Sequence, residues 1–361
     1  MRCRAVCVLA ILTMAVAPWA HGVTYTFVDL NPTGYTTTSA NAIGGGGQVG
    51  AGGSGALLWS GSAGSVVSLH PGGNFNYTRG EGGGAGQQVG WGYNSATGHD
   101  HALLWTGSAA SVEDLHPAAY DGSRAFGAAG GQQVGTGYDA ATYNETALLW
   151  TGTAASAVSL HPATGYQNSW AYATDGSQQV GSAETDGGDE YALLWTGTAA
   201  SGVVLHPAGY DGSIAEGVGD GQQVGTGWTS TAYEALLWTG SAGSAVSLNP
   251  GADYHHSSAM ACAGGVQVGY AECYADSESH ALAWFGTDAS VVDLNTFLPA
   301  GYEWASASGI DADGNIVGQA GGPGFAHACM WIPQAAVIPE PATMALLGLG
   351  LAAVARRRRR K

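Results

Sequence analysis

The stretch that decides the fold runs from His101 to Pro117 and reads HALLWTGSAASVEDLHP. Relatives of it occur along most of the chain, and its central tryptophan recurs at Trp59, Trp105, Trp150, Trp195, Trp238, Trp284 and Trp331. The intervals between successive tryptophans are 46, 45, 45, 43, 46 and 47 residues. A period of about 20 to 50 residues is typical of repeat architectures, so we expect one repeat domain rather than two ordinary domains.

Each repeat contains four apolar segments in a constant order. A V-x-L segment followed by proline, as in Val203 to Pro207, precedes a short alanine-rich segment, as in Ala171 to Ala173. A QVGxGY segment, as in Gln133 to Tyr138, then precedes the ALLW segment and a turn of small residues. Segments of four to six residues between turns indicate strands, because a helix needs about 10 residues to bury a stripe.

The turns between these segments favour a closed ring of sheets. The chain has 60 glycines, mostly in GG, DG and TG pairs, and such pairs before the QVGxGY segment are typical of two-residue hairpins. Four antiparallel strands in each of seven units predict an all-β fold, a seven-bladed β-propeller over residues 23–333. An open stacked array is the alternative, but it needs a capping unit, and neither end unit is longer or more polar than the rest. We place the blade boundary inside the opening stretch, so that its tryptophan closes one blade and its LHP turn begins the next.

The repeated tryptophan is interpreted as a packing residue. A buried tryptophan removes about 150 to 250 Å² from water, which at about 25 cal/mol per Å² corresponds to roughly 4 to 6 kcal/mol before the costs of folding. Seven such anchors would hold the blades together without ion pairs. We therefore expect these side chains in the core and not at a ligand site.

The charge distribution restricts the partners. Between Val23 and Ile338 the only basic residues are Arg79 and Arg124, against 26 acids (27 less Glu340), which gives 2 − 26 = −24. This surface repels phosphate backbones, so nucleic acid is excluded as a partner. Cations and neutral polymers such as polysaccharide remain. The two arginines occupy corresponding loops of neighbouring units, which points to a ligand site there.

Two further tryptophans are candidate ligand contacts. Trp170 and Trp304 are placed where a loop leads into a strand, near Tyr166 and Tyr302, and exposed rings there would stack on sugars. There is no GxSxG, HExxH or P-loop motif, and the acids show no fixed pairing of the kind that glycosidases use. We therefore expect no enzyme, and keep a hydrolase or lyase acting on extracellular polysaccharide as the alternative.

Histidines recur at one position of the repeat. A ring of them facing a channel would bind metal, but asparagine replaces histidine in the other units, so we expect a hydrogen bond to the turn before proline instead. The histidines are His70, His116, His161 and His206, and the asparagines are Asn31, Asn249 and Asn295.

No metal site or cofactor is expected from the remaining motifs. Asp311 to Asn315 resembles a calcium loop but lacks the third oxygen ligand and the downstream glutamate, so we interpret it as a hairpin turn. Diffuse calcium binding by the acids stays open.

The cysteines predict no disulfide framework. A two-residue turn at Gly264 and Gly265 would pair Cys262 with Gln267 and leave Cys273 further along the ladder, too far for a direct disulfide. Cys329 has no evident mate.

The repeats resemble a known family. Units such as Ala305 to Trp331, ASASGIDADGNIVGQAGGPGFAHACMW, are similar to the HAF-type extracellular repeats of bacterial secreted proteins. The matching residues are Asp293, Leu294, Ser306, Ala307, Ile310, Asp311, Gly314, Ile316, Val317, Gly318, His327, Ala328 and Trp331. The departures are Leu or Cys for the usual Phe, and Gln-Gln in place of the usual turn. The resemblance implies an exported repeat domain with no established common activity.

The two ends of the chain predict its destination. Residues 1–22, MRCRAVCVLAILTMAVAPWAHG, have a basic start, an apolar run and small residues at the end, which is typical of a signal peptide cleaved after Ala20 or Gly22. Residues 334–361 resemble the PEP-CTERM sorting tail of Gram-negative bacteria, which an exosortase recognises. The resemblance makes Pro339, Glu340 and Pro341 the recognition motif. It makes the basic end the stop-transfer signal: Arg356, Arg357, Arg358, Arg359 and Arg360.

The apolar run from Met344 to Ala355 suits a transient anchor. Its 12 residues span about 18 Å as a helix, less than the bilayer core of about 30 Å. Basic residues stay on the cytoplasmic side, so the acidic body would lie outside. A conventional single-span anchor is the alternative. We expect an exported protein of the cell envelope, cell surface or extracellular matrix that acts as a binding or structural scaffold, with an exosortase and extracellular polysaccharide as partners.

Overall fold

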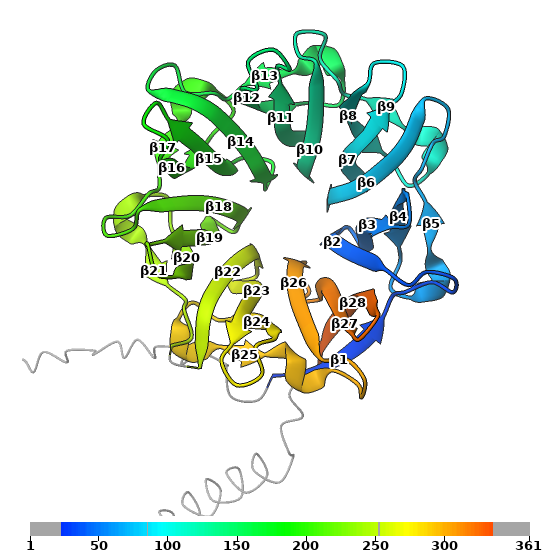
Figure 1. The fold of residues 1–361 in the computed structure, drawn as a ribbon, viewed down its shortest axis with the longest axis vertical. Coiled ribbons are helices and arrows are strands. Elements are labelled where there is room, and N and C mark those ends of the chain that lie inside the picture. The colour runs from blue at the N-terminus through cyan, green and yellow to red at the C-terminus, as the bar shows by residue number, and fades with distance from the viewer. Residues whose placement is uncertain (1–22, 85, 252, 335–361) are drawn as a thin grey trace, which may run out of the picture.

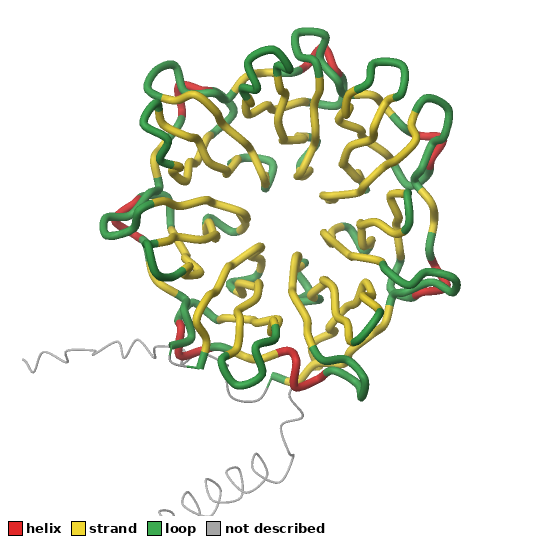
Figure 2. The backbone as a smooth tube through the Cα atoms, viewed as in Figure 1, coloured by secondary structure: helices red, strands yellow, loops and turns green. Residues whose placement is uncertain are grey.

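Seven four-stranded antiparallel sheets form a closed ring, with their innermost strands toward its centre (Figures 1 and 2). The computed structural model describes residues 23–84, 86–251 and 253–334. The expected signal peptide and the expected sorting tail from residue 335 onward lie outside these residues. The prediction of a seven-bladed β-propeller is confirmed.

We number the blades 1 to 7 by their innermost strands. These are β2 (Thr38–Gly44), β6 (Phe75–Gly84), β10 (Gly122–Ala129), β14 (Tyr166–Thr174), β18 (Gly212–Gly219), β22 (Tyr254–Ala263) and β26 (Trp304–Ile310). The second strands are β3 (Gly47–Gly52), β7 (Gln87–Asn94), β11 (Gln132–Tyr138), β15 (Gln179–Thr185), β19 (Gln222–Trp228), β23 (Val266–Cys273) and β27 (Ile316–Gly322).

The ALLW segments and the V-x-L segments form the outer half of each blade. The third strands are β4 (Gly55–Trp59), β8 (His99–Trp105), β12 (Glu145–Trp150), β16 (Glu190–Trp195), β20 (Tyr233–Trp238), β24 (Ser279–Trp284) and β28 (Phe325–Gln334). The outermost strands are β5 (Val67–Ser68), β9 (Glu113–Asp114), β13 (Val158–Ser159), β17 (Val203–Val204), β21 (Val246–Ser247), β25 (Val292–Asp293) and β1 (Thr24–Asp29). The short 3₁₀ helices are η1 (Ala63–Ser65), η2 (Ala109–Ser111), η3 (Ala154–Ser156), η4 (Ala199–Ser201), η5 (Ala242–Ser244), η6 (Asp288–Ser290) and η7 (Leu294–Phe297).

The N-terminal strand closes the ring. β1 pairs antiparallel with β28 of blade 7 and places Phe27 opposite Trp331 and Val28 opposite Met330 (Figure 1). One blade is thus assembled from both ends of the described chain. The open stacked array is excluded, because its end units would not pair with each other.

The blade boundary differs from the expected one. The outermost strand β13 pairs back onto β12, with Leu149 opposite Val158, after the 3₁₀ turn η3. The expectation that the tryptophan closes a blade is therefore wrong, because it ends only the third strand and a fourth strand follows. The boundary lies at the LHP turn. Two residues of outer strand carry too little pattern to show which neighbour they pair with.

The repeated tryptophans fill the spaces between blades. All seven are at most 1% exposed, and Trp150 packs with Val89, Leu104 and Leu115 of the preceding blade. Within the described part of the chain, none of the seven indole N–H groups finds a hydrogen-bond acceptor. Their role as packing residues is confirmed.

The Gln-Gln pair links neighbouring blades. The buried Gln133 side chain accepts a hydrogen bond from the Gly152 N–H at 2.7 Å and donates to Gln87 Oε1 of the preceding blade at 3.0 Å. Equivalent bonds between blades join Gln179 to Gln132 and Gln223 to Gln178. The Gln-Gln pair therefore supplies a row of polar contacts from blade 2 to blade 5.

The cysteines lie as the hairpin turn predicted. Cys262 lies opposite Gln267, as the turn predicted, and the three cysteines of the described residues, Cys262, Cys273 and Cys329, are buried free thiols. In residues 23–84, 86–251 and 253–334 no helix has the length and apolarity to cross a bilayer. The run from Met344 to Ala355 lies outside those ranges.

Candidate functional site at the mouth of the central channel

A β-bulge in every innermost strand sets the chemistry of the channel wall. In β10 the register shifts between Ala125 and Gly127, so that Phe126 has no partner in β11. A bulge re-aims the unpaired side chain, and small residues on either side leave it room. The unpaired residues of the seven blades are Asn41, Glu81, Phe126, Tyr172, Glu216, Met260 and Ser308.

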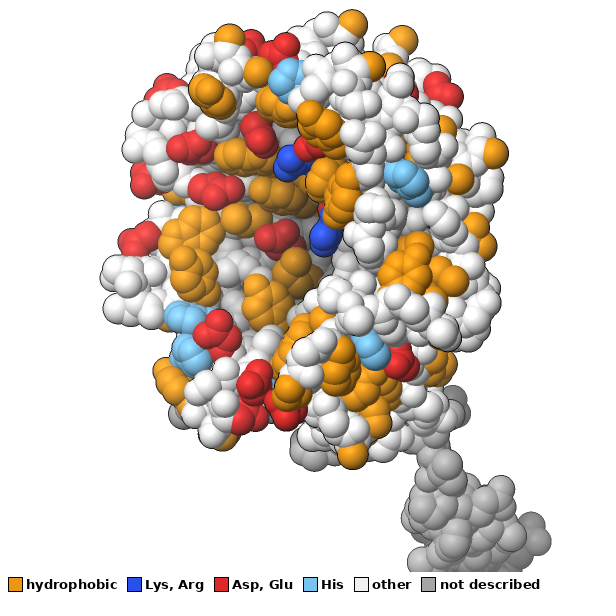
Figure 3. All heavy atoms as spheres, turned by 45° about the vertical axis from the view of Figure 1, so that its right-hand side comes forward, with side chains coloured by type: hydrophobic (Ala, Val, Ile, Leu, Met, Phe, Trp, Pro, Cys, Tyr) orange, Lys and Arg blue, Asp and Glu red, His pale blue; other side chains and the backbone are white. Residues whose placement is uncertain are grey.

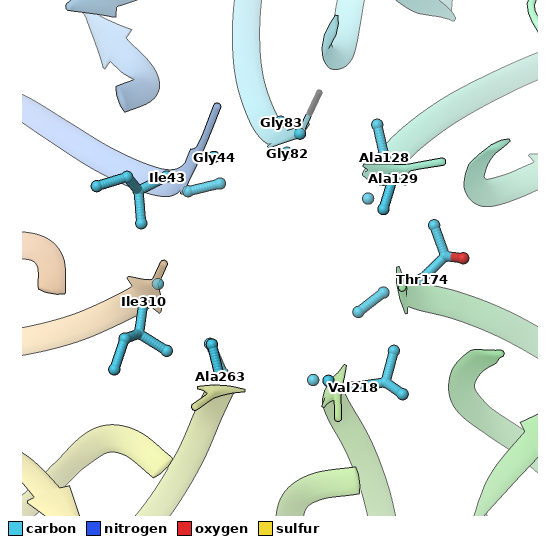
Figure 4. A pocket seen from close by; sticks show the side chains of 18 of the residues that line it. Ile43, Gly44, Gly82, Gly83, Ala128, Ala129, Thr174, Val218, Ala263 and Ile310 are labelled. Atoms are coloured by element: carbon cyan, nitrogen blue, oxygen red, sulfur yellow. The ribbon is translucent and has the colours of Figure 1, made fainter. Parts of the chain in front are cut away.

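These seven side chains line one cavity along the axis of the ring. Its volume is about 840 Å³, and all seven bulge residues contribute to its wall. Mostly uncharged residues at the ends of the same strands surround the open centre, among them Ile43, Ala128, Thr174 and Val218 (Figure 4). The blades share almost every packing position, but at the bulge they differ. The channel wall is therefore the part of the ring where the repeat has diversified.

One arginine is tied to the channel wall in blade 2. Arg79 Nε lies 2.7 Å from Glu81 Oε1, which also accepts a hydrogen bond from Trp91 Nε1 at 3.0 Å. Asn41 of blade 1 donates to the other oxygen of Glu81 at 3.2 Å. Burial raises the pKa of Glu81, and Arg79 opposes this shift. Glu81 is thus held by three neighbours from two blades.

The second arginine, Arg124, contacts the indole of Trp91 directly. The Arg124 guanidinium lies 4.7 Å from the centre of the Trp91 ring, in a cation–π contact, and its Nε donates to Asp100 Oδ2 at 2.9 Å. Both arginines stay about 40% exposed, with side-chain values of 39% for Arg79 and 43% for Arg124. Trp91 therefore joins the two basic residues of the described chain into one cluster. Figure 3 shows the basic side chains in the hollow of this face, among carboxylates and apolar groups.

The contact between blades 2 and 3 recurs between blades 3 and 4. Trp170 in β14 occupies the strand position of Arg124 and donates its indole N–H to Glu145 Oε2 of β12. Glu145 takes the place that Asp100 has in β8. The next blade has Glu190 at this position, where it accepts a hydrogen bond from Ser182 at 2.6 Å. Three successive blades thus present a row of carboxylates beside aromatic and basic groups.

Glu216 has the most altered acidity of the carboxyls in the channel wall. Burial raises its pKa to about 7, and the nearby charge of Glu190 adds to the shift. Burial also raises the pKa of Glu190. Glu216 therefore exchanges its proton near neutral pH.

Replacing Glu216 by glutamine is expected to change the pH dependence of stability. A carboxyl whose pKa rises from 4.5 in the unfolded chain to about 7 in the folded protein binds its proton more tightly when folded. The stability from this carboxyl is complete below about pH 4.5 and is lost as the pH rises through about 7. The Glu216→Gln variant should match the wild type at pH 4 and exceed it by about 1 to 3 kcal/mol at pH 8. Urea unfolding of both proteins at both pH values checks this. A stability difference between the two proteins that is the same at pH 4 and at pH 8 would contradict it.

The sequence-predicted ligand contacts are partly brought together. Arg79 and Arg124 do stand at corresponding positions of neighbouring units, but these lie within β6 and β10, so the expected loops are wrong. The inner strands are longer than the alanine-rich segments, because the bulge and the neighbouring glycines remain part of each strand. Trp170 lies in the middle of β14 rather than at a strand start. Trp304 does begin β26, in blade 7, where its ring lies against Gly321 and away from the cluster of blades 2 to 4.

Several residues of this site could not be predicted from the motifs of any one unit. Glu81, Trp91 and Asp100 hold the arginines, and Glu145 holds Trp170. A signal was present in the repeat: the alanine-rich segment reads A-x-G or A-x-A in most units, and x varies far more than the two small residues beside it. Aligning the units and inspecting that position would have found the channel residues.

The repeated histidines connect blades and are not gathered at the channel. His116 Nδ1 lies 3.0 Å from Ser123 Oγ of the next blade, and that hydroxyl accepts the Ala102 N–H. The bond of His116 thus crosses the blade boundary, whereas Asn31, which takes the place of histidine in blade 1, donates to the Tyr35 carbonyl of its own turn at 2.8 Å. Burial lowers the pKa of His116. The same contact, at 2.9 to 3.0 Å, occurs in three other blades at His70, His161 and His206.

The acidic stretch near the C-terminal blade forms a hairpin turn between β26 and β27. Asp311 Oδ1 accepts hydrogen bonds from the N–H groups of Asp313 and Asn315, and Gly314 has a φ of 81°. Both oxygens of Asp311 are used within the turn, since Asn315 Nδ2 donates to the second. Calcium binding by the acidic surface stays a prediction.

Solved structures share the fold at low sequence identity. The β-propeller domain of the trilobed protease from Pyrococcus furiosus, described as having an open velcro topology, superposes with a TM-score of 0.56 at 9% identity, over 84% of this chain and 100% of that one. An acylaminoacyl peptidase of Pyrococcus horikoshii gives a TM-score of 0.54 at 11% identity, over 89% of this chain and 55% of that one. The chain thus spans about half of that peptidase. The pairing of β1 with β28 distinguishes this ring from an open one.

The sequence comparisons identify only the C-terminal end. No curated protein matches the chain significantly. Residues 337–360 match the model of the PEP-CTERM protein-sorting motif, which confirms the tail that Pro339, Glu340 and Pro341 indicated. This motif is the recognition signal for an exosortase and implies export with sorting to the cell envelope or surface in Gram-negative bacteria. The chain is therefore an exported β-propeller with an exosortase sorting signal at its C-terminal end.

Proposed function

We propose that this protein is a binding scaffold of the cell surface or extracellular matrix, and that the mouth of its channel, across blades 2 to 4, holds extracellular polysaccharide. The signal peptide at residues 1–22, the HAF-type character of the repeats and the transient membrane anchor of the tail belong to the same proposal.

The observation that carries the proposal is the cluster around Trp91. It links both described arginines to the indole of Trp91 beside the channel, Arg124 by direct contact and Arg79 through Glu81, in a chain whose described part is otherwise rich in acids. Binding sites are typically concave, largely apolar and equipped with a few convergent polar groups. Carboxylates, guanidinium groups and indoles together offer hydrogen bonds to hydroxyls and flat faces for sugar rings.

The second indole extends the same surface into the next blade. Trp170 lies at the strand position of Arg124, one blade further round the ring, and its N–H is fixed by Glu145. A series of equivalent positions along neighbouring blades suits a linear polymer, because successive residues of the polymer would meet successive blades. The net charge excludes polyphosphates as the main partner.

Glycan-array screening of the mature protein tests this proposal. We expect retention of one class of extracellular polysaccharide, and an affinity at least about 10-fold lower for Trp170→Ala, equal to a loss of about 1.4 kcal/mol. Trp304→Ala, in blade 7, is the matched control and should bind as the wild type does. Equal losses in both variants, or no retained glycan, would refute the channel mouth as the binding surface.

A hydrolase or lyase acting on extracellular polysaccharide is the second candidate function. The observation in its favour is the pKa of Glu216 near 7, because a general acid is most effective when its pKa lies near the working pH. In that case Glu216→Gln abolishes depolymerisation and retains binding. Unchanged chain length of the polysaccharide after incubation with the wild-type protein would remove this candidate.

A further inference from the structure

The loop between β23 and β24 in blade 6 gathers three metal-ligating side chains away from the channel wall. Cys273, Asp276 and His280 each offer one ligand atom, and these atoms lie within 4.8 Å of one another. In a tetrahedral site with bonds of about 2.0 to 2.3 Å, the ligand atoms lie about 3.3 to 3.8 Å apart, so small side-chain shifts suffice.

The histidine of this group is already oriented. Its Nδ1 lies 2.8 Å from Asp293 Oδ2, and its Nε2 points to Asp276 Oδ2 at 3.1 Å. A neutral imidazole that donates Nδ1–H to a carboxylate leaves the lone pair of Nε2 free, and this arrangement is usual for histidines bound to zinc. With a metal at Nε2, Asp293 would accept the Nδ1–H of His280 and hold the ring in place.

The loop backbone holds the other two ligands. Asp276 Oδ1 accepts the Glu278 N–H at 3.1 Å, which leaves Oδ2 facing His280. The Ser277 N–H donates to the Cys273 carbonyl at 3.0 Å, and Ser277 itself adopts a φ of 63°, which is uncommon for a residue other than glycine. The tight turn brings the aspartate back over the cysteine.

The three ligand side chains differ in how far they are exposed to solvent. Cys273 is buried, the His280 side chain is 13% exposed and the Asp276 side chain is 48% exposed. An ion would therefore approach from the aspartate side and reach the thiol at the base of the loop.

We propose that Cys273, Asp276 and His280 form a binding site for Zn²⁺. Thiolate, imidazole and carboxylate together are ligands that zinc accepts in tetrahedral geometry, and three protein ligands leave the fourth position to water. The site is independent of the channel and of the proposed polysaccharide binding. It also departs from the sequence-based expectation that the chain holds no metal.

The equivalent loop of blade 2 has the histidine but lacks the cysteine and the aspartate. There His101 Nδ1 lies 2.7 Å from Asp114 Oδ2, and Thr97 Oγ1 lies 3.0 Å from His101 Nε2. Asn94 ends the second strand as Cys273 does in blade 6. The histidine–aspartate pair therefore occurs in more than one blade, and blade 6 adds a thiol and a carboxylate at the two positions that complete a ligand set.

A second group of ligand side chains lies in the same blade but is less suited. His255 Nε2 lies 2.7 Å from Glu272 Oε2, and His256 completes the set. However, His256 Nδ1 accepts the Tyr233 N–H at 3.2 Å, and a metal at the other ring nitrogen would require a proton on Nδ1 and break that bond. This group serves as the control.

Metal titration of the full chain under reducing conditions tests the proposal. We expect saturable binding of one Zn²⁺ per chain, and with Co²⁺ a thiolate-to-metal charge-transfer absorption in the near ultraviolet. Cys273→Asn/Asp276→Thr, which installs the residues of blade 2, should abolish both signals. His255→Gln/Glu272→Gln should retain both, and Asp293→Asn should weaken Zn²⁺ binding by about 10 to 100-fold.

The outcomes separate the proposal from its alternatives. Absence of saturable Zn²⁺ binding, or of the charge-transfer band in the wild-type chain, would overturn it. So would binding that survives in Cys273→Asn/Asp276→Thr and disappears in His255→Gln/Glu272→Gln. The band of the wild type reports a sulfur ligand directly, and its loss in Cys273→Asn/Asp276→Thr together with its retention in His255→Gln/Glu272→Gln assigns that ligand to Cys273.

Discussion

The Gly135→Ala variant is expected to lose at least about 3 kcal/mol of folding free energy, because the new methyl group would overlap with the backbone. A Cβ at this position would stand 2.0 Å from the Arg124 carbonyl oxygen and 2.8 Å from the Ala125 Cα. Neither atom can rotate away, since both belong to the paired strand β10. The two inner strands would have to separate at the bulge that shapes the channel wall.

The same constraint applies to every blade. A Cβ would come within 1.8 to 2.0 Å of the inner-strand carbonyl at Gly50, Gly90, Gly135, Gly181, Gly225, Gly269 and Gly318. The glycine of the QVG motif is therefore required by close approach of the strands and not by a turn.

Gly243→Ala is the matched control for this prediction. A Cβ on Gly243 would meet no atom within 4 Å, and other units carry alanine at the equivalent position, as at Ala155 and Ala200. Its midpoint of urea denaturation should stay within error of the wild type, whereas that of Gly135→Ala should fall strongly. Equal midpoints for the two variants would show that the strands are less closely packed than described.

Trp150→Ala is expected to lose about 3 to 5 kcal/mol, the usual cost of truncating a buried aromatic side chain. Trp150 is fully buried and fills the space between blades 2 and 3, against Leu104 and Leu115. Removal leaves a cavity between two sheets whose twisted shapes limit collapse. Thermal and urea unfolding measure the loss.

Trp150→Phe separates packing from hydrogen bonding. Because the indole N–H of Trp150 has no acceptor among the described residues, phenylalanine should lose only volume and cost about half as much as alanine. A phenylalanine variant as unstable as the alanine variant would point to a polar role of the indole.

The fold was predictable because its rules are repeated seven times. The tryptophan spacing, the glycine pairs and the short apolar segments each act locally, and their agreement from unit to unit favoured the propeller over the open stacked array. The blade boundary was not predictable, because two-residue strands such as Val158–Ser159 pair equally well, by pattern, with the preceding or the following segment.

The site was predictable only in part. Arg79 and Arg124 stand out in the sequence because they are rare, and the structure places Arg124 on the Trp91 ring and Arg79 on Glu81, which accepts the Trp91 indole N–H. Their partners Glu81 and Asp100 lie 2 and 24 residues away from them along the chain, and the second distance has meaning only once neighbouring blades are packed together. The bulge that turns Glu81 toward the channel depends on register, which a single unit does not reveal.

The central claim is that polysaccharide binds at the channel mouth of blades 2 to 4. Amide hydrogen exchange with and without the retained glycan tests it most directly, because it locates the bound polymer without any substitution. The account predicts slower exchange at the inner strands β6, β10 and β14, and unchanged exchange in blade 7. Protection confined to the outermost strands, or spread evenly over all seven blades, would contradict it.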